Sequence, residues 1–139
     1  MKTSCMRQTV IGIFFTLLLG ACSSDSGGGG GGFIPTFNAT WAVDGTDGAY
    51  RMDLQPNEAN KNVEMGVFNG EEQHDNDPDL DGNPLSGSFN GKNIEYTIQR
   101  DNHNSVTFTG KMIPVNEESG QIIRIELSSS EGNIVLVPL

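Results

Sequence analysis

Short runs in which apolar and polar residues alternate cover most of the chain after residue 33. In residues 93–100, for example, Ile94, Tyr96 and Ile98 alternate with polar residues. Alternation with a period of two is typical of antiparallel β-strands with one buried and one wet face. No window of 11 residues carries the apolar stripe of an amphipathic helix. The pattern predicts eight strands, at residues 37–43, 49–55, 63–69, 85–89, 93–100, 105–113, 121–128 and 133–137.

The turn residues between these runs predict that neighbouring strands pair as hairpins. Asn90-Gly91 separates two runs, and both residues tolerate the positive φ angles of a tight hairpin turn. Glu131-Gly132-Asn133 joins the last two runs in a similar way. We therefore expect an all-β meander of about eight antiparallel strands. Closure into an up-and-down barrel would remove the sheet edges, and a two-sheet β-sandwich is the alternative.

The first predicted strand and the later turns resemble those of calycin-type barrels such as lipocalins and avidins. Trp41 lies in the first strand, and the turns S-G-S-F-x-G and T-F-T-G follow along the meander. Ala39 stands where the lipocalin G-x-W motif has glycine, so no ligand-binding residue is assigned from the resemblance. The resemblance implies a barrel whose interior holds side chains or one small ligand. We expect Trp41, Tyr96, Phe108 and Ile125 to point inward, with Trp41 as a core or barrel-end residue.

The N-terminal residues resemble the signal peptide of bacterial lipoproteins. Lys2 and Arg7 precede an apolar run at residues 10–19, which ends in the lipobox-like Leu19-Gly20-Ala21-Cys22. The apolar run is shorter than the roughly 20 residues that span a bilayer. The resemblance implies that residues 1–21 are removed and that Cys22 is the lipidation site. Its thiol would carry diacylglycerol and its amine a further acyl chain such as palmitate, and two or more chains anchor stably.

The same resemblance predicts a location for the protein. Ser23 follows Cys22, and in enteric bacteria a serine there favours the outer membrane. We therefore expect a membrane-anchored lipoprotein of the cell envelope, in the outer membrane and facing the periplasm. Cys5 would leave with the signal peptide, so the mature domain would have no free thiol and no disulfide.

A flexible tether and one domain are expected after the anchor. Residues 22–32 are rich in serine and end in six consecutive glycines. Such a segment buries too little apolar surface to fold, and it has an r.m.s. span of roughly 17 Å. We therefore divide the chain into a signal peptide at 1–21, a tether at 22–32 and an all-β domain at 33–139.

The net negative charge of the chain argues against some classes of partner, and many of the acidic residues lie in one segment. The formal net charge of −10 becomes −12 once Lys2 and Arg7 are removed, which argues against nucleic acid and against attraction to anionic lipid. Residues 71–83 hold six carboxylates and neither lysine nor arginine.

Part of this segment resembles a calcium-binding loop. Asp77, Asp79 and Asp81 followed by Gly82 match the opening of an EF-hand-like loop. The twelfth position is Ser88 rather than glutamate, and no helix flanks the loop. Two interpretations stay open: weak Ca²⁺ binding by the Asp75–Asp81 loop, or a solvated and disordered acidic loop between two strands.

No pattern of catalytic residues is found in the sequence. The two histidines, His74 and His103, fall in predicted loops, and motifs such as G-x-S-x-G, H-E-x-x-H and the P-loop are missing. We therefore expect a protein that is not an enzyme and has no cofactor besides a possible Ca²⁺. The expected function is a non-catalytic binding or interaction module, anchored to the membrane at Cys22, with an unknown envelope protein as partner. The alternatives are a binder of small hydrophobic molecules in the barrel interior and, third, a weak Ca²⁺-binding protein.

Overall fold

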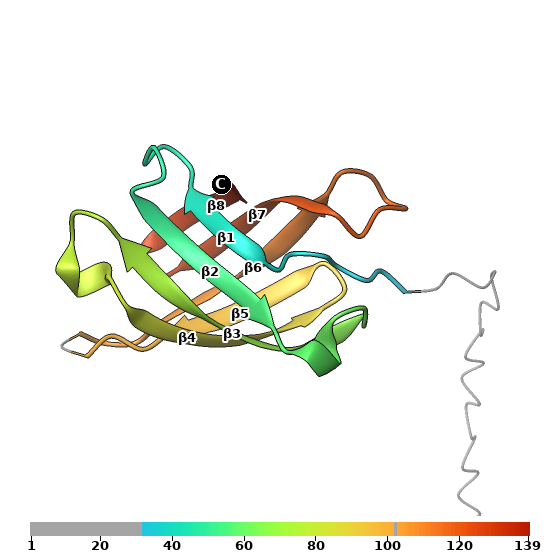
Figure 1. The fold of residues 1–139 in the computed structure, drawn as a ribbon, viewed down its shortest axis with the longest axis horizontal. Helices are drawn as coiled ribbons and strands as arrows, with labels where there is room; N and C mark the ends of the chain where they lie inside the picture. Colours follow the sequence, from blue (N-terminus) through green and yellow to red (C-terminus); the bar gives the residue numbers. More distant parts are fainter. Residues whose placement is uncertain (1–31, 102) are drawn as a thin grey trace, which may run out of the picture. The chain divides into compact units, whose positions relative to one another are not determined.

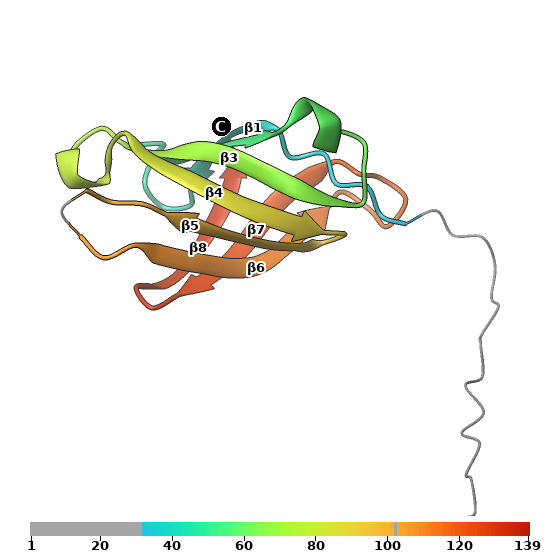
Figure 2. The ribbon, with the colours of Figure 1, turned by 90° about the horizontal axis from the view of Figure 1, so that it is seen from below.

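The chain folds into a closed antiparallel β-barrel. The computed structural model describes residues 32–101 and 103–139, so Cys22 and nearly all of the predicted tether lie outside the described residues. Each strand pairs with the next, and the last pairs with the first (Figures 1 and 2). The strands are β1 (Ala39–Val43), β2 (Tyr50–Pro56), β3 (Met65–His74), β4 (Asn83–Asn90), β5 (Asn93–Ile98), β6 (Val106–Pro114), β7 (Ile122–Ser129) and β8 (Gly132–Pro138).

The pairing of β1 confirms the predicted barrel over the sandwich. Trp41 is opposite Met52 of β2 on one side and opposite Pro138 of β8 on the other. Every strand therefore has two neighbours, and no sheet edge is left open. All eight predicted strands are present, and so is the predicted hairpin after residue 90. Its turn lies one residue later than predicted: Asn90 ends β4 and pairs with Asn93, so the two turn residues are Gly91, at φ 55°, and Lys92.

The structure differs from the prediction in the acidic segment. Residues 71–74 were predicted to belong to a long loop, but they continue β3 as far as His74, and β4 begins at Asn83. The connection is therefore only residues 75–82, and it contains the short 3₁₀ turn η2 (Pro78–Leu80). The β2–β3 connection contains a second 3₁₀ turn, η1 (Glu58–Asn60).

Side chains fill the interior of the barrel. Trp41, Tyr96, Phe108 and Ile125 are all buried, as predicted. The rings of Phe68 and Tyr96 meet edge to face, with centroids 6.2 Å apart, and the rings of Tyr96 and Phe108 are 5.4 Å apart. Aromatic and aliphatic side chains from every strand complete this core; those of strands β2, β4 and β6 to β8 include Met52, Leu54, Leu85, Phe89, Met112, Leu127 and Leu136.

Two inward-facing glycines allow the strands to approach closely. A Cβ atom on Gly110 of β6 would meet the backbone of Glu126 in β7. A Cβ atom on Gly87 of β4 would meet the side chains of Tyr96 and Phe68 in the core. Glycine at these positions therefore lets the barrel coil tightly around its aromatic side chains.

The first described residues close one end of the barrel. Thr36 donates its backbone N–H to Gly120 O at 2.6 Å and accepts from Ile122 N at 3.2 Å. This strap places the buried ring of Phe37 edge to face with Phe68, at a centroid distance of 5.4 Å. Trp41 Nε1 donates to Phe37 O at 2.9 Å, so Trp41 helps to hold this plug.

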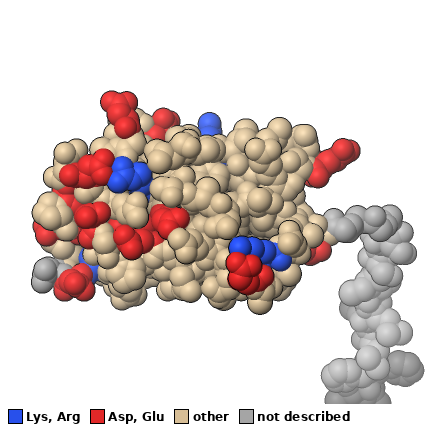
Figure 3. All heavy atoms as spheres, in the orientation of Figure 1, with Lys and Arg blue, Asp and Glu red and all other residues tan. Residues whose placement is uncertain are grey.

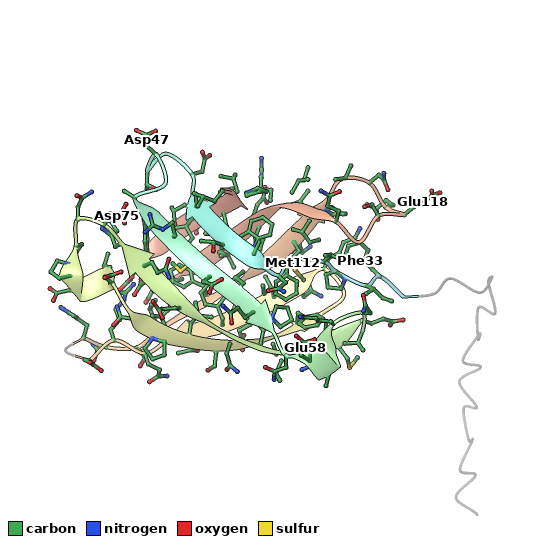
Figure 4. The ribbon with its side chains drawn as sticks, viewed as in Figure 1. Phe33, Asp47, Glu58, Asp75, Met112 and Glu118 are labelled. Atoms are coloured by element: carbon green, nitrogen blue, oxygen red, sulfur yellow. The ribbon has the colours of Figure 1, made fainter. Side chains whose placement is uncertain are left out.

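The barrel has two chemically different ends. We call the end with residues 32–38 the N-terminal end; the β2–β3, β4–β5 and β6–β7 connections also lie there. We call the opposite end the acidic end; it carries the β1–β2, β3–β4, β5–β6 and β7–β8 connections. In Figure 4, Phe33, Glu58 and Glu118 lie toward the N-terminal end, and Asp47 and Asp75 lie toward the acidic end. No helix among the described residues is long and apolar enough to cross a membrane.

Candidate functional site

The acidic end concentrates most of the charge of the domain. Its four connections, residues 44–49, 75–82, 99–105 and 130–131, hold eight carboxylates and one basic residue, Arg100. In Figure 3 the acidic side chains gather at this end of the molecule. The three connections at the N-terminal end, residues 57–64, 91–92 and 115–121, hold four carboxylates and two lysines. The acidic end is therefore the region where electrostatic attraction of a partner is strongest.

A buried glutamate lies beneath these acidic connections. Glu72 of β3 points into the barrel and is completely inaccessible to solvent. Its Oε1 accepts hydrogen bonds from Tyr50 Oη and Arg100 Nη2, both at 2.6 Å. Its Oε2 accepts from Asn83 Nδ2 and Arg100 Nε, both at 2.9 Å. Four donors thus surround the carboxylate, as a buried charge requires.

Arg100 neutralises this carboxylate and links it to the surface. Arg100 follows β5, and its side chain is only 5% exposed. Two nitrogen atoms of its guanidinium group contact the two carboxylate oxygens of Glu72, so the contact is bidentate. Its Nη1 donates to Glu131 Oε1 in the β7–β8 connection at 2.8 Å. The hydrogen bonds to Glu72, followed by the one to Glu131, raise the pKa of the Arg100 guanidinium above its usual range. Arg100 therefore connects β3 to two connections of the acidic end.

Tyr50 and Asn83 extend the cluster toward the β3–β4 connection. Burial, and next the hydrogen bond to Glu72, raise the pKa of the Tyr50 hydroxyl well above its usual range. Asn83 Nδ2 donates to Glu72 and also to Asp79 O, at 2.9 Å in each case. The backbone of the acidic connection is therefore attached to the buried carboxylate through one amide side chain.

The three aspartates predicted as calcium ligands are each engaged separately. Asp77 Oδ1 accepts from Asp79 N at 3.1 Å, as a cap of the 3₁₀ turn. Asp81 Oδ1 accepts from His74 N at 3.2 Å. Asp79 Oδ2 lies 3.6 Å from His103 Nε2. No group of three or more His, Cys, Asp or Glu side chains within residues 32–101 and 103–139 is arranged to hold a metal ion, and calcium binding stays a prediction.

The two histidines lie at the acidic end but in different surroundings. His74 Nδ1 accepts from Asn76 N at 3.2 Å, and its ring lies 5.1 Å from that of Tyr50. His103 lines a hollow of about 130 Å³ together with Asp79, Asp81 and Asp101. His74 contacts backbone and His103 contacts a carboxylate, and among the described residues neither is hydrogen-bonded to a serine, threonine or cysteine.

An ion pair on the outer wall fixes the start of the β3–β4 connection. Arg51 of β2 makes a bidentate contact with Asp75, at 2.6 and 3.0 Å. This contact holds the pKa of the Asp75 carboxyl below its usual range. Because both side chains face solvent, the pair orients the loop more than it stabilises the fold.

The buried cluster was missed by the sequence analysis, although one signal could have revealed it. Phe68 points inward, and a period of two along β3 places residues 70, 72 and 74 on the same face. Continuing that period into the acidic run predicts an inward Glu72, which in turn requires a cationic partner. Arg100 is the one basic residue in the connections of that end, whereas Arg51 falls on the outer face of β2.

Comparison with known protein families, with curated proteins and with solved structures finds no match to the chain.

Proposed function

We propose that the chain is a lipid-anchored protein of the cell envelope, facing the periplasm from the outer membrane, whose barrel acts as a non-catalytic interaction module. The lipobox-like Leu19-Gly20-Ala21-Cys22 and the glycine-rich tether support the anchoring part of the proposal. The partner is an envelope protein that contacts the outside of the barrel.

The packing of the interior is the observation that carries this proposal. Phe37 plugs the N-terminal end, aromatic and aliphatic side chains fill the middle, and the pair of Glu72 and Arg100 occupies the acidic end. A barrel of eight strands has room either for its side chains or for one small ligand. Because side chains take up this room, recognition at the outer surface is better supported than transport of a small hydrophobic molecule.

The distribution of charge suggests which face meets the partner. The acidic end carries eight carboxylates on four connections, and the hydrogen bonds around Glu72 and Arg100 hold three of these connections in place. A preorganised surface of one charge sign accelerates association with a surface of the opposite sign. The expected contact surface of the partner is therefore basic.

Site-specific photo-crosslinking in intact cells tests the proposal. A photoreactive amino acid is placed at Asn76 on the acidic end, at Thr107 on the barrel wall or at Asn116 on the N-terminal end. We expect one protein adduct of constant mass, formed from Asn76 and not from Thr107. A triple variant with Asp77, Asp79 and Asp101 changed to asparagine should lose this adduct, because the attraction is weakened.

Two results would count against an interaction module. One is the failure of every exposed position to form a protein adduct. The other is a small molecule that co-purifies in stoichiometric amount and is detected by native mass spectrometry. The second result would favour the barrel interior as a binding site.

A further inference from the structure

Large hydrophobic side chains that face solvent are concentrated at the N-terminal end. Six are exposed within residues 32–101 and 103–139, and five of these lie on the N-terminal segment, the first residues of β3 and β7, and the β6–β7 connection. The sixth, Leu139, lies against Gly48 in the β1–β2 connection of the acidic end. The five are Ile34, Met65, Val67, Val115 and Ile123, which are 40, 60, 52, 50 and 44% exposed.

Backbone hydrogen bonds hold part of this apolar rim in place. The strap between Thr36 and Gly120 fixes the segment of Ile34 against the β6–β7 connection. In that connection, Val115 N donates to Gln121 O at 2.9 Å. Ile34 and Val115 are therefore presented by connected backbone, and the cost of ordering them on binding is small.

The charges of the same end are largely paired with each other. Lys61 Nζ lies 2.6 Å from Glu58 Oε1, and Lys92 forms an ion pair with Glu117. Lys92 Nζ also lies 5.3 Å from the centre of the Phe33 ring. The connections of this end carry a formal charge of −2, against −7 for those of the acidic end. The free-energy cost of bringing charges close to a lipid surface is therefore lower at this end than at the acidic end.

We propose that the rim formed by Ile34, Met65, Val67, Val115 and Ile123 rests on the bilayer, so that the acidic end points away from the membrane. This inference rests on the proposed acylation of Cys22. Nine residues lie between Cys22 and Gly32, which is at the N-terminal end, and a flexible linker of that length has an r.m.s. span of roughly 17 Å.

Because the proposed lipid anchor already holds the domain near the bilayer, a weak contact between the rim and the bilayer is enough to orient it. A short flexible linker gives an effective concentration in the millimolar range, so a surface with little affinity of its own still binds for much of the time. The hydrophobic gain comes from apolar area removed from water. Anionic lipids repel the acidic end and so select the same orientation.

Fluorescence quenching on vesicles tests this orientation. The full-length acylated protein is reconstituted in vesicles of phosphatidylcholine with a minority of phosphatidylglycerol, some lipids carrying a nitroxide near the headgroup. The label NBD is attached to V115C or, as the matched control, to D47C. Removal of Cys5 with the proposed signal peptide and acylation of Cys22 would leave the introduced cysteine as the single reactive thiol. Flotation of the vesicles measures anchoring independently, with C22S as the negative control.

We expect the probe at residue 115 to be quenched severalfold more than the probe at residue 47, at both low and high salt. The variant I34E/M65E should lower the quenching at 115 to the level at 47, while L139E should leave it unchanged. Equal quenching at both positions in protein that floats with the vesicles would overturn the orientation and leave the anchor intact. A blue-shifted but unquenched probe at 115 would mean that protein, such as a second copy, covers the rim, and it would overturn the inference too. Failure of the full-length protein to float would remove the proposed anchor and, with it, this inference.

Discussion

Removing Arg100 is the perturbation that bears most directly on the buried cluster. In Arg100→Met the Glu72 carboxylate keeps its bonds from Tyr50 and Asn83 but loses both bonds from the guanidinium. The carboxylate then remains completely buried with no opposite charge beside it. We expect a large loss of stability from this one substitution.

The size of the loss follows from the burial of the pair. Breaking a buried ion pair by removing one partner costs about 3–5 kcal/mol. The lost contact with Glu131 adds little, because the Glu131 side chain is 50% exposed. With a urea m-value of about 2 kcal/mol per M, the midpoint of unfolding should fall by roughly 2 M.

Trp41 provides the assay. It is the single tryptophan of the chain and is buried in the barrel, so its fluorescence reports unfolding in urea. The matched control is Arg51→Met, the same substitution at an arginine whose partner, Asp75, faces solvent. That control should shift the midpoint much less, because exposed pairs contribute little.

A second substitution separates an unpaired charge from lost packing. Glu72→Gln added to Arg100→Met removes the buried charge and retains amide hydrogen bonding to Tyr50 and Asn83. We expect the double variant to recover at least half of the stability lost in Arg100→Met, which is roughly 2 kcal/mol. A loss below about 1 kcal/mol in Arg100→Met, or a double variant that is less stable than Arg100→Met alone, would refute the reasoning.

Three further predictions concern the tyrosines, the plug and the acidic connection. The chain has two tyrosines, and burial raises the pKa of both Tyr50 and Tyr96. Their contribution to stability is complete below the unfolded pKa of about 10 and is lost as pH rises above it. Tyrosinate absorbance should therefore appear only together with unfolding. A tyrosine that titrates near pH 10 in folded protein would contradict this. Phe37→Ala should lower the free energy of unfolding by about 3–5 kcal/mol, because it leaves a cavity against Phe68 and Phe89. The control Phe33→Ala should lower it less, as measured by unfolding in urea. Equal losses would mean that Phe37 does not close the barrel. Calorimetric titration with millimolar Ca²⁺ should give no saturable heat, because Asp77, Asp79 and Asp81 are engaged separately; saturable heat that is lost in Asp77→Asn would support the calcium hypothesis instead.

The sequence predicted the strands well because their pattern is local. Alternation such as that of Ile94, Tyr96 and Ile98 specifies both the strand and its buried face. Turn residues such as Asn90-Gly91 then specify that neighbouring strands pair. Closure depends on the pairing of β1 with β8, which are the most distant strands along the chain, so no local pattern specifies it.

The acidic end could be predicted only in composition. A run of charged residues carries no apolar alternation, so the end of β3 at residues 71–74 was assigned to the loop. Burial of Glu72 depends on Arg100, which is 28 residues away and two strands later. Such a contact is set by tertiary structure, and propensity along the chain does not reveal it.

The central claim is that side chains fill the barrel, which leaves its outer surface to recognise a partner. A crystal structure of the protein purified from its own envelope tests this claim most directly. We predict that the density between Phe37 and the pair of Glu72 and Arg100 belongs to side chains alone. Density for a non-protein molecule in that space, with core side chains such as Tyr96 and Phe108 moved aside to admit it, would contradict the account and identify the interior as the binding site.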